Sequence, residues 1–186
     1  MIQYQEIIID ILKNGNVREE RTGTGAISRF GIQKRFDLSR GFPAVTTKKL
    51  FWTPVVGELL WFMQGLTNVE DLRRITWGEG SDRKTIWDEN YEAQGKALGY
   101  TGGELGPVYG KQWRSFGNVN PVDQLQRAID LIKNNPTDRR MLVSAWNPED
   151  LDKATLPSCH YMFQFYVEND KLSLMFNMRS TDVFLG

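Results

Sequence analysis

The sequence predicts a mixed α/β or α+β fold, because helical and strand patterns both occur and the longest strand patterns lie near its end. Apolar residues recur at helical spacing in three segments. Two aromatic and apolar runs, 160–168 and 171–178, flank the turn signal Asn169-Asp170 and predict a β-hairpin. A chain of 186 residues, 40% hydrophobic and 25% charged, can bury one core, so we expect one domain over residues 1–186.

The first element expected is an amphipathic helix that ends at Gly15. The Gly- and Thr-rich segment 21–25 predicts a loop, and the alternation over 26–37 predicts a strand. Residues 41–43, which include glycine and proline, end that strand. The helical stripe consists of Tyr4, Ile7, Ile8, Ile11 and Leu12.

A second, largely apolar helix is expected over residues 54–64, with the carboxylate of Glu58 in its middle. Thr67 and Glu70 fit a capping box that begins a short helix reaching about residue 75. The polar, Gly-rich segment 76–86 predicts a loop.

A third helix is expected to start with Asn120 as its N-cap and Pro121 in its first turn, and to end at residues 134–136. A strand over 141–146 and the hairpin complete the predicted order. The apolar face of this helix consists of Val122, Leu125, Ile129 and Ile132.

The overall charge favours no particular macromolecular partner. Lys and Arg together number 23, as do Asp and Glu, so nothing in the balance calls for nucleic acid or an anionic membrane. No apolar run is long enough to span a bilayer, and the N-terminus does not resemble a signal peptide. A single cysteine is typical of a reducing compartment, which predicts a cytoplasmic protein.

The only cysteine and the only histidine are neighbours, Cys159 and His160. An isolated cysteine is either a buried structural residue or a reactive thiol, and this run alone favours the structural interpretation. Adjacent strand residues point to opposite faces, so His160 is poorly placed to deprotonate Cys159. If the thiol is a nucleophile, fixed positive charge is the candidate that would favour its thiolate.

Several arginines could supply that charge or bind an anion. Arg21 lies in the Gly- and Thr-rich loop, Arg139 and Arg140 precede a strand, and Arg179 is followed by the hydroxyl of Ser180. The alternative for each is a solvated surface arginine, and for a single arginine taken alone that alternative is favoured.

Glu58 is a candidate for proton chemistry. A carboxylate among apolar helical residues is costly to bury without hydrogen bonds, and such groups often have perturbed pKa values. The alternative is a glutamate at the boundary of the core.

Taken together, nine segments make the chain resemble the thymidylate synthase family, in family order from end to end. They are RTGTG (21–25), GFPAVTTKK (41–49), ELLWF (58–62), IWDE (86–89), GPVYGKQWR (106–114), DRR (138–140), VSAWN (143–147), CH (159–160) and RSTDVFLG (179–186). The resemblance implies a mixed sheet with packed helices. It also implies methylation of dUMP at C5, with 5,10-methylenetetrahydrofolate as carbon donor and reductant and no metal site.

The resemblance implies a role for each candidate residue. Cys159 would add to C6 of the uracil, Glu58 would organise water and proton transfer, Tyr109 would assist removal of the C5 proton, and His160 would join the water network near the base. The dUMP site would comprise Arg21, Arg179, Ser180 and Asp182, with Arg139 and Arg140 donated across a homodimer interface. The folate site would comprise Trp87, Asp182, Leu185 and Gly186.

Two positions depart from the family pattern. The family commonly has proline before the cysteine and glutamine before the Arg-Ser pair, where this chain has Ser158 and Met178. Met178 removes a polar group beside the expected nucleotide site.

The apolar, uncapped end at residues 183–186 leads us to expect a truncated chain without the family's Leu-Pro-Phe-Asn continuation. Two alternatives therefore stay open. One is a pyrimidine deoxynucleotide hydroxymethylase acting on dCMP or dUMP, and the other is a non-catalytic fragment.

Overall fold

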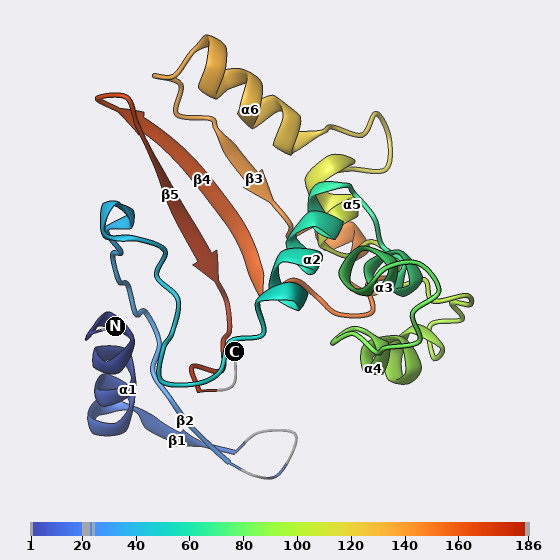
Figure 1. Ribbon diagram of the computed structural model, residues 1–186, viewed down its shortest axis with the longest axis horizontal. Helices are drawn as coiled ribbons and strands as arrows, with labels where there is room; N and C mark the ends of the chain where they lie inside the picture. Colours follow the sequence, from blue (N-terminus) through green and yellow to red (C-terminus); the bar gives the residue numbers. More distant parts are fainter. Residues whose placement is uncertain (1, 20–22, 24, 185–186) are drawn as a thin grey trace. The chain divides into compact units, whose positions relative to one another are not determined.

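The computed structural model describes residues 2–19, 23 and 25–184, and the chain divides into two compact units (Figure 1). The first unit combines the chain up to Phe51 with the segment from Thr181, and the second runs from Trp52 to Ser180. Helices and antiparallel sheets both occur, so the predicted mixed fold class is confirmed. The single domain expected over residues 1–186 stays a prediction.

The first unit contains the predicted N-terminal helix and a two-stranded sheet. Its elements are α1 (Ile2–Asn14), β1 (Asn16–Arg18), β2 (Ala26–Ser28) and a short 3₁₀ helix (Leu38–Arg40). The strand expected over 26–37 is therefore mostly wrong. β1 supplies only three paired residues, and Gly31 then turns the chain with a φ of 78°.

The second unit carries the remaining helices. They are α2 (Trp52–Met63), α3 (Val69–Trp77), α4 (Asp88–Asn90), a π-helix (Tyr91–Gly95), α5 (Tyr109–Arg114), α6 (Gln124–Asn134) and a 3₁₀ turn (Pro148–Asp150). The capping box proposed at Thr67 is wrong by one residue. Asn68 is the N-cap and accepts the Glu70 N–H at 2.8 Å, because the Thr67 carbonyl is already bonded to the Leu105 N–H.

The start of α6 also differs from the prediction. Asn120 has a left-handed φ of 55°, and Val122 forms a β-bridge with Phe116 instead of a first helical turn. Asp123 is the N-cap, and its carboxylate accepts the Gln126 N–H at 2.9 Å. The helix therefore begins at Gln124, two residues after Val122, which takes part in the β-bridge.

The larger sheet has the order β3-β4-β5 and is antiparallel throughout. Its strands are β3 (Leu142–Ser144), β4 (His160–Glu168) and β5 (Lys171–Met178), so the hairpin is confirmed. Asn169 and Asp170 both have positive φ, which suits the tight turn between β4 and β5. The predicted strand over 141–146 is present in its central three residues.

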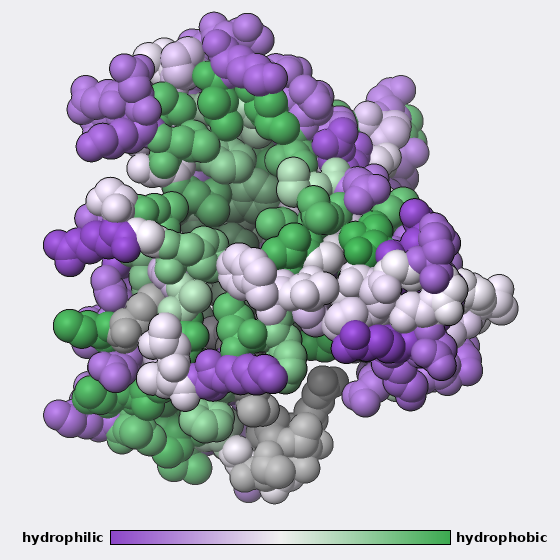
Figure 2. Space-filling view, viewed as in Figure 1, coloured by the Kyte–Doolittle hydropathy of each residue, from purple (hydrophilic) through white to green (hydrophobic). Residues whose placement is uncertain are grey.

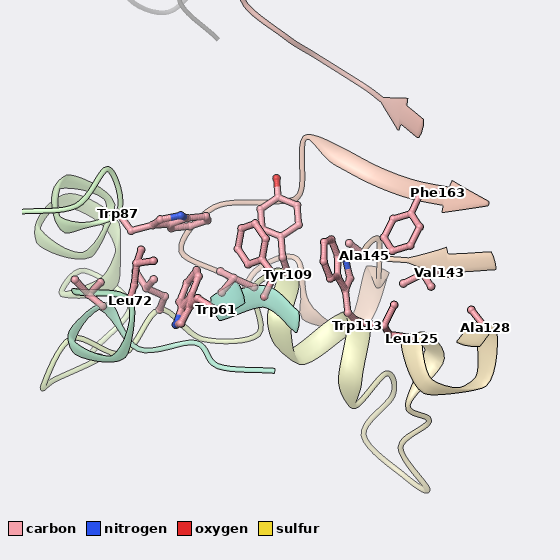
Figure 3. Packing of buried hydrophobic residues seen from close by; sticks show 14 residues of the cluster. Trp61, Leu72, Trp87, Tyr109, Trp113, Leu125, Ala128, Val143, Ala145 and Phe163 are labelled. Carbon is pink, nitrogen blue, oxygen red and sulfur yellow. The ribbon is translucent and has the colours of Figure 1, made fainter. Parts of the chain in front are cut away.

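One face of this sheet closes the main core (Figure 3). Val143 of β3 and Phe163 of β4 pack with Leu125 and Ala128 of α6, so α6 covers that face. The core continues through Trp113 of α5 to a cluster of aromatic side chains. This aromatic end contains Trp61, Phe62, Trp87 and Tyr109.

Apolar side chains also lie at the surface, and Figure 2 shows hydrophobic residues over the region that β3–β5 occupy in Figure 1. Leu142, Tyr166 and Met175 are exposed, and strand alternation puts them on the sheet face opposite Val143 and Phe163. Among the described residues, no helix has the length and apolarity needed to cross a bilayer.

Candidate functional site

The Cys159 thiol contacts a guanidinium group. Cys159 precedes β4, and Arg179 follows β5 directly, so the pairing of the two strands brings these residues together. The Arg179 N–H donates to the Cys159 carbonyl at 2.9 Å, and Arg179 Nη2 lies 3.6 Å from Cys159 Sγ. A positive charge next to sulfur stabilises a thiolate relative to a thiol.

Backbone carbonyls hold the Arg179 side chain in this position. Its Nε donates to the Ser158 carbonyl and its Nη2 to the Pro157 carbonyl, each at 2.9 Å. The guanidinium also lies 5.6 Å from the ring centre of Trp146. These contacts leave Arg179 at the edge of a cavity of about 310 Å³, lined by Trp146, Tyr161, Met178 and Arg179.

Tyr109 contacts the backbone of Cys159. The first residue of α5, Tyr109, is buried, and its hydroxyl oxygen accepts the Cys159 N–H at 2.7 Å. Burial raises the pKa of Tyr109 to about 12, so the phenol keeps its proton at neutral pH. A neutral hydroxyl that accepts from the backbone still has its own hydrogen to donate.

His160 belongs to an aromatic stack with Tyr109 and Phe176. Its ring stacks on Tyr109 with centroids 3.9 Å apart and planes 14° apart, and on Phe176 at 5.4 Å. Burial lowers the pKa of His160 to about 4, and its Nδ1 is a buried atom without a hydrogen-bond partner in the described structure. The imidazole is therefore neutral at physiological pH.

Glu58 extends the site along α2. Its Oε1 accepts the indole N–H of Trp87 at 2.6 Å, and the Trp87 ring lies 6.1 Å from that of Tyr109. Burial raises the pKa of Glu58, which outweighs the opposite effect of the hydrogen bond from Trp87. This carboxyl therefore holds a proton to higher pH than an ordinary glutamate does.

The other arginines predicted for the site lie outside this set of contacts. Arg139 and Arg140 are exposed in the connection between α6 and β3. The Arg139 carbonyl accepts from Gln164 at 3.0 Å, and Arg140 is 3.4 Å from the Asp138 carboxylate. Ser180 is exposed directly after Arg179.

Of the four remaining predicted residues, three lie outside the described residues and one belongs to the first unit. Arg21, Leu185 and Gly186 lie outside the described residues. Asp182 belongs to the first unit, where its carboxylate accepts the Phe184 N–H at 2.8 Å. In the part of the chain that the structure describes, no three His, Cys, Asp or Glu side chains gather as a metal ion would need.

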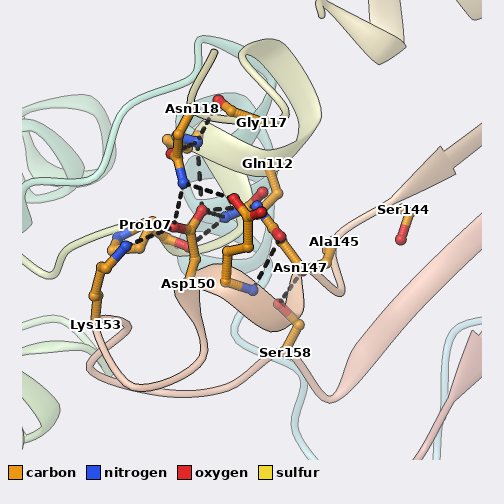
Figure 4. Close-up of polar contacts among 12 residues, drawn as sticks. Pro107, Gln112, Gly117, Asn118, Ser144, Ala145, Asn147, Asp150, Lys153 and Ser158 are labelled. Atoms are coloured by element: carbon orange, nitrogen blue, oxygen red, sulfur yellow. Dashed lines mark hydrogen bonds and ion pairs between the residues drawn. The ribbon is translucent and has the colours of Figure 1, made fainter. Parts of the chain in front are cut away.

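Sequence reasoning missed the buried carboxylate of Asp150, which organises the polar contacts in Figure 4. Burial alone would raise the pKa of Asp150, but hydrogen bonds from Gln112 and Asn118 and the charge of Lys111 lower it. No local pattern marks Asp150, because the partners that lower its pKa come from α5 and the segment after it, more than 30 residues away. Trp146 and Tyr161 were also missed as cavity residues.

The chain matches the family model described as thymidylate synthase over residues 2–186. It is 56% identical to a thymidylate synthase of Enterobacteria phage T4 over 186 residues, which are 100% of this chain and 64% of that protein. It is 54% identical over 187 residues to a probable thymidylate synthase of Escherichia phage T5, covering 100% of this chain and 66% of that protein.

The crystal structure of thymidylate synthase from phage T4 superimposes with a TM-score of 0.94 at 55% identity, over 100% of this chain and 64% of that one. The chain thus spans slightly less than two thirds of the length of these relatives. A family match from residue 2 to residue 186, with this identity and this structural agreement, leaves one assignment: the chain belongs to the thymidylate synthase family.

Proposed function

We propose that this protein methylates dUMP at C5 to give dTMP, with Cys159 as the nucleophile. The observation that carries the proposal is the Cys159 sulfur, 3.6 Å from a guanidinium that carbonyl groups hold in place at the edge of a cavity. Family membership supports the substrate. Trp146 and Tyr161 offer flat, partly apolar surfaces to the pyrimidine ring of dUMP. Arg179 and Ser180 offer hydrogen-bond donors to the phosphate of the same nucleotide.

The first step is addition of the Cys159 thiolate to C6 of the uracil. A carbon–sulfur bond forms, and the electron pair of the C5–C6 double bond moves towards C5 and the adjacent carbonyl. C5 then has carbanion character and can attack an electrophilic carbon. Arg179 Nη2 is in contact with the sulfur that starts this sequence, and the Tyr109 hydroxyl holds the backbone N–H of the nucleophile.

The one-carbon unit and the hydride would come from 5,10-methylenetetrahydrofolate. Trp87, with the Glu58 carboxyl hydrogen-bonded to its indole, would contact that cosubstrate, and Asp182, Leu185 and Gly186 are proposed to complete its site. Glu58 can hold a proton for transfer, because burial raises its pKa. Tyr109 and His160 are neutral at pH 7, so they would orient water and the C5 proton rather than supply charge.

We also propose a cytoplasmic homodimer that uses the open face of the β3-β4-β5 sheet. Leu142, Tyr166 and Met175 expose apolar surface there, which is typical of an interaction site. Gln164 on the same face binds the Arg139 carbonyl. Arg139 and Arg140 are thus at the border of the proposed interface, from which they would reach the phosphate in the partner subunit, with Arg21 completing the site.

The test is a spectrophotometric assay with dUMP and methylenetetrahydrofolate. The proposal predicts an absorbance rise from dihydrofolate, dTMP by mass spectrometry, and loss of both in Cys159→Ser. Hydroxymethyl-dUMP or hydroxymethyl-dCMP without dihydrofolate would identify a hydroxymethylase instead. No product from either nucleotide would overturn the proposal in favour of a non-catalytic chain.

A further inference from the structure

Asp150 is a buried charged residue that the proposed chemistry does not use. It is 3% exposed and lies at the end of the 3₁₀ turn that follows β3. Its carboxylate accepts hydrogen bonds from Gln112 and Asn147 at 2.9 Å, from Asn118 at 3.2 Å and from Lys111 at 3.4 Å (Figure 4). A buried carboxylate is stable only with such partners, because an unpaired buried charge is costly. Moving any of these donors away from Asp150 is therefore unfavourable.

Two of these partners belong to α5, the helix that begins with Tyr109. Lys111 and Gln112 are in the same short helix as Tyr109. Their bonds to Asp150 therefore also restrict the position of the Tyr109 side chain. Gln112 also donates to the Pro107 carbonyl at 3.0 Å, which anchors the segment just before the helix. Asp150 therefore joins α5 to the segment that leads to Cys159.

That segment, residues 151–158, is attached to its surroundings at further points. Thr155 donates its N–H and its hydroxyl to the Leu105 carbonyl, at 3.0 and 2.5 Å. The Ser158 hydroxyl donates to the Ala145 carbonyl at 3.1 Å. The segment is therefore bonded to α5 at both ends. Asp150 binds α5 just before the segment begins, and the Cys159 N–H donates to the Tyr109 hydroxyl just after it ends.

We propose that Asp150 is a positioning residue for the Cys159 nucleophile. Its carboxylate fixes the position of α5 relative to segment 151–158. The Tyr109 hydroxyl is then within hydrogen-bond distance of the Cys159 N–H, and the Cys159 sulfur lies next to Arg179. The assignment rests on the proposed role of Cys159. Its geometry can nevertheless be tested without substrate, because the chain contains one cysteine.

The test uses the full chain labelled with [¹⁵N]cysteine, which gives a single amide cross-peak in a proton–nitrogen NMR spectrum. Tyr109→Phe removes the acceptor of the Cys159 N–H, so it defines the shift that marks loss of this contact. In Asp150→Asn, one carboxylate oxygen becomes an amide donor that faces other donors, which disrupts the contacts of the carboxylate. Asp152→Asn is the matched control, because Asp152 is an exposed carboxylate in the same loop.

We expect Asp150→Asn to move the Cys159 peak by at least half of the Tyr109→Phe displacement, and Asp152→Asn to leave it in place. A lower melting temperature with an unmoved peak would show a structural role only and would overturn the proposal. If Asp150→Asn does not fold, Lys111→Met decides, because it removes one contact of the Asp150 carboxylate, together with the bonds of Lys111 to Gly117 and Asn118, and keeps the aliphatic stem. It should move the peak in the same direction by a smaller amount, and an unmoved peak would again overturn the proposal.

These outcomes are independent of turnover. A moved peak in a protein that makes no dTMP would leave the positioning role standing and remove the proposed function. An unmoved peak in a protein that makes dTMP would overturn the positioning role of Asp150 and leave the proposed function standing.

Discussion

His160 should make the folded protein sensitive to acid, and the size of the effect follows from its burial. Its pKa falls from 6.5 to about 4 because the imidazolium loses hydration in the aromatic stack. The unfolded chain therefore takes up the proton first as the pH drops. Stability is fully present above the ordinary pKa and is lost as the pH falls towards 4. At 1.36 kcal/mol for each pH unit, the loss by pH 4 is about 3 kcal/mol.

His160→Phe isolates this effect, because phenylalanine keeps an aromatic ring between Tyr109 and Phe176 but cannot titrate. Urea unfolding of both proteins from pH 7 to pH 4 gives the difference in unfolding free energy at each pH. Contributions from carboxylates are shared by both proteins and cancel in that difference. The variant should gain about 3 kcal/mol relative to the parent across this range. Parallel pH profiles, or an NMR titration of this single histidine with a midpoint near 6.5, would refute the reasoning.

Three further substitutions test other parts of the site. Glu58→Gln should raise the melting temperature more at pH 8 than at pH 4, because the raised pKa means that stability is lost as the pH rises and the carboxyl ionises; an equal effect at both pH values would contradict this. Ser158→Ala should lower the unfolding free energy by about 1 kcal/mol in urea titrations, since it leaves the Ala145 carbonyl without this hydroxyl. Gly110→Ala should cost about 2 kcal/mol or more by the same measurement, because the new methyl group would meet the Leu66 carbonyl oxygen; wild-type stability would show that α5 is not held closely there.

Elements with strong local patterns could be predicted from the sequence. The hairpin is one, because Asn169 and Asp170 tolerate positive φ and the flanking runs are rich in strand formers. The helix around Glu58 is another. The start of α6 could not be predicted, since Val122 fits the apolar spacing of the helix but forms a β-bridge with Phe116 instead.

The candidate site divides in a similar way. The contact between Cys159 and Arg179 depends on the register of β4 and β5. Because the hairpin turn sets that register, the sequence could predict that the two residues lie close together. The role of Asp150 could not be predicted, because Lys111, Gln112 and Asn118 lie more than 30 residues away and an isolated Asp in a polar loop is indistinguishable from a surface residue. Tertiary contacts alone show that it is buried.

The central claim is that the Cys159 thiolate adds to C6 of dUMP. Addition at C6 gives C5 its carbanion character, and C5 would then bond to the one-carbon unit of methylenetetrahydrofolate. The C5 hydrogen would leave as a proton after that bond has formed, so [5-³H]dUMP incubated with this cosubstrate should release tritium into water. We predict time-dependent release with the parent chain and none with Cys159→Ser, while Asp152→Asn, an exposed change in the same loop, behaves as the parent does. Equal release by the parent and Cys159→Ser, or no release by either, would contradict the account.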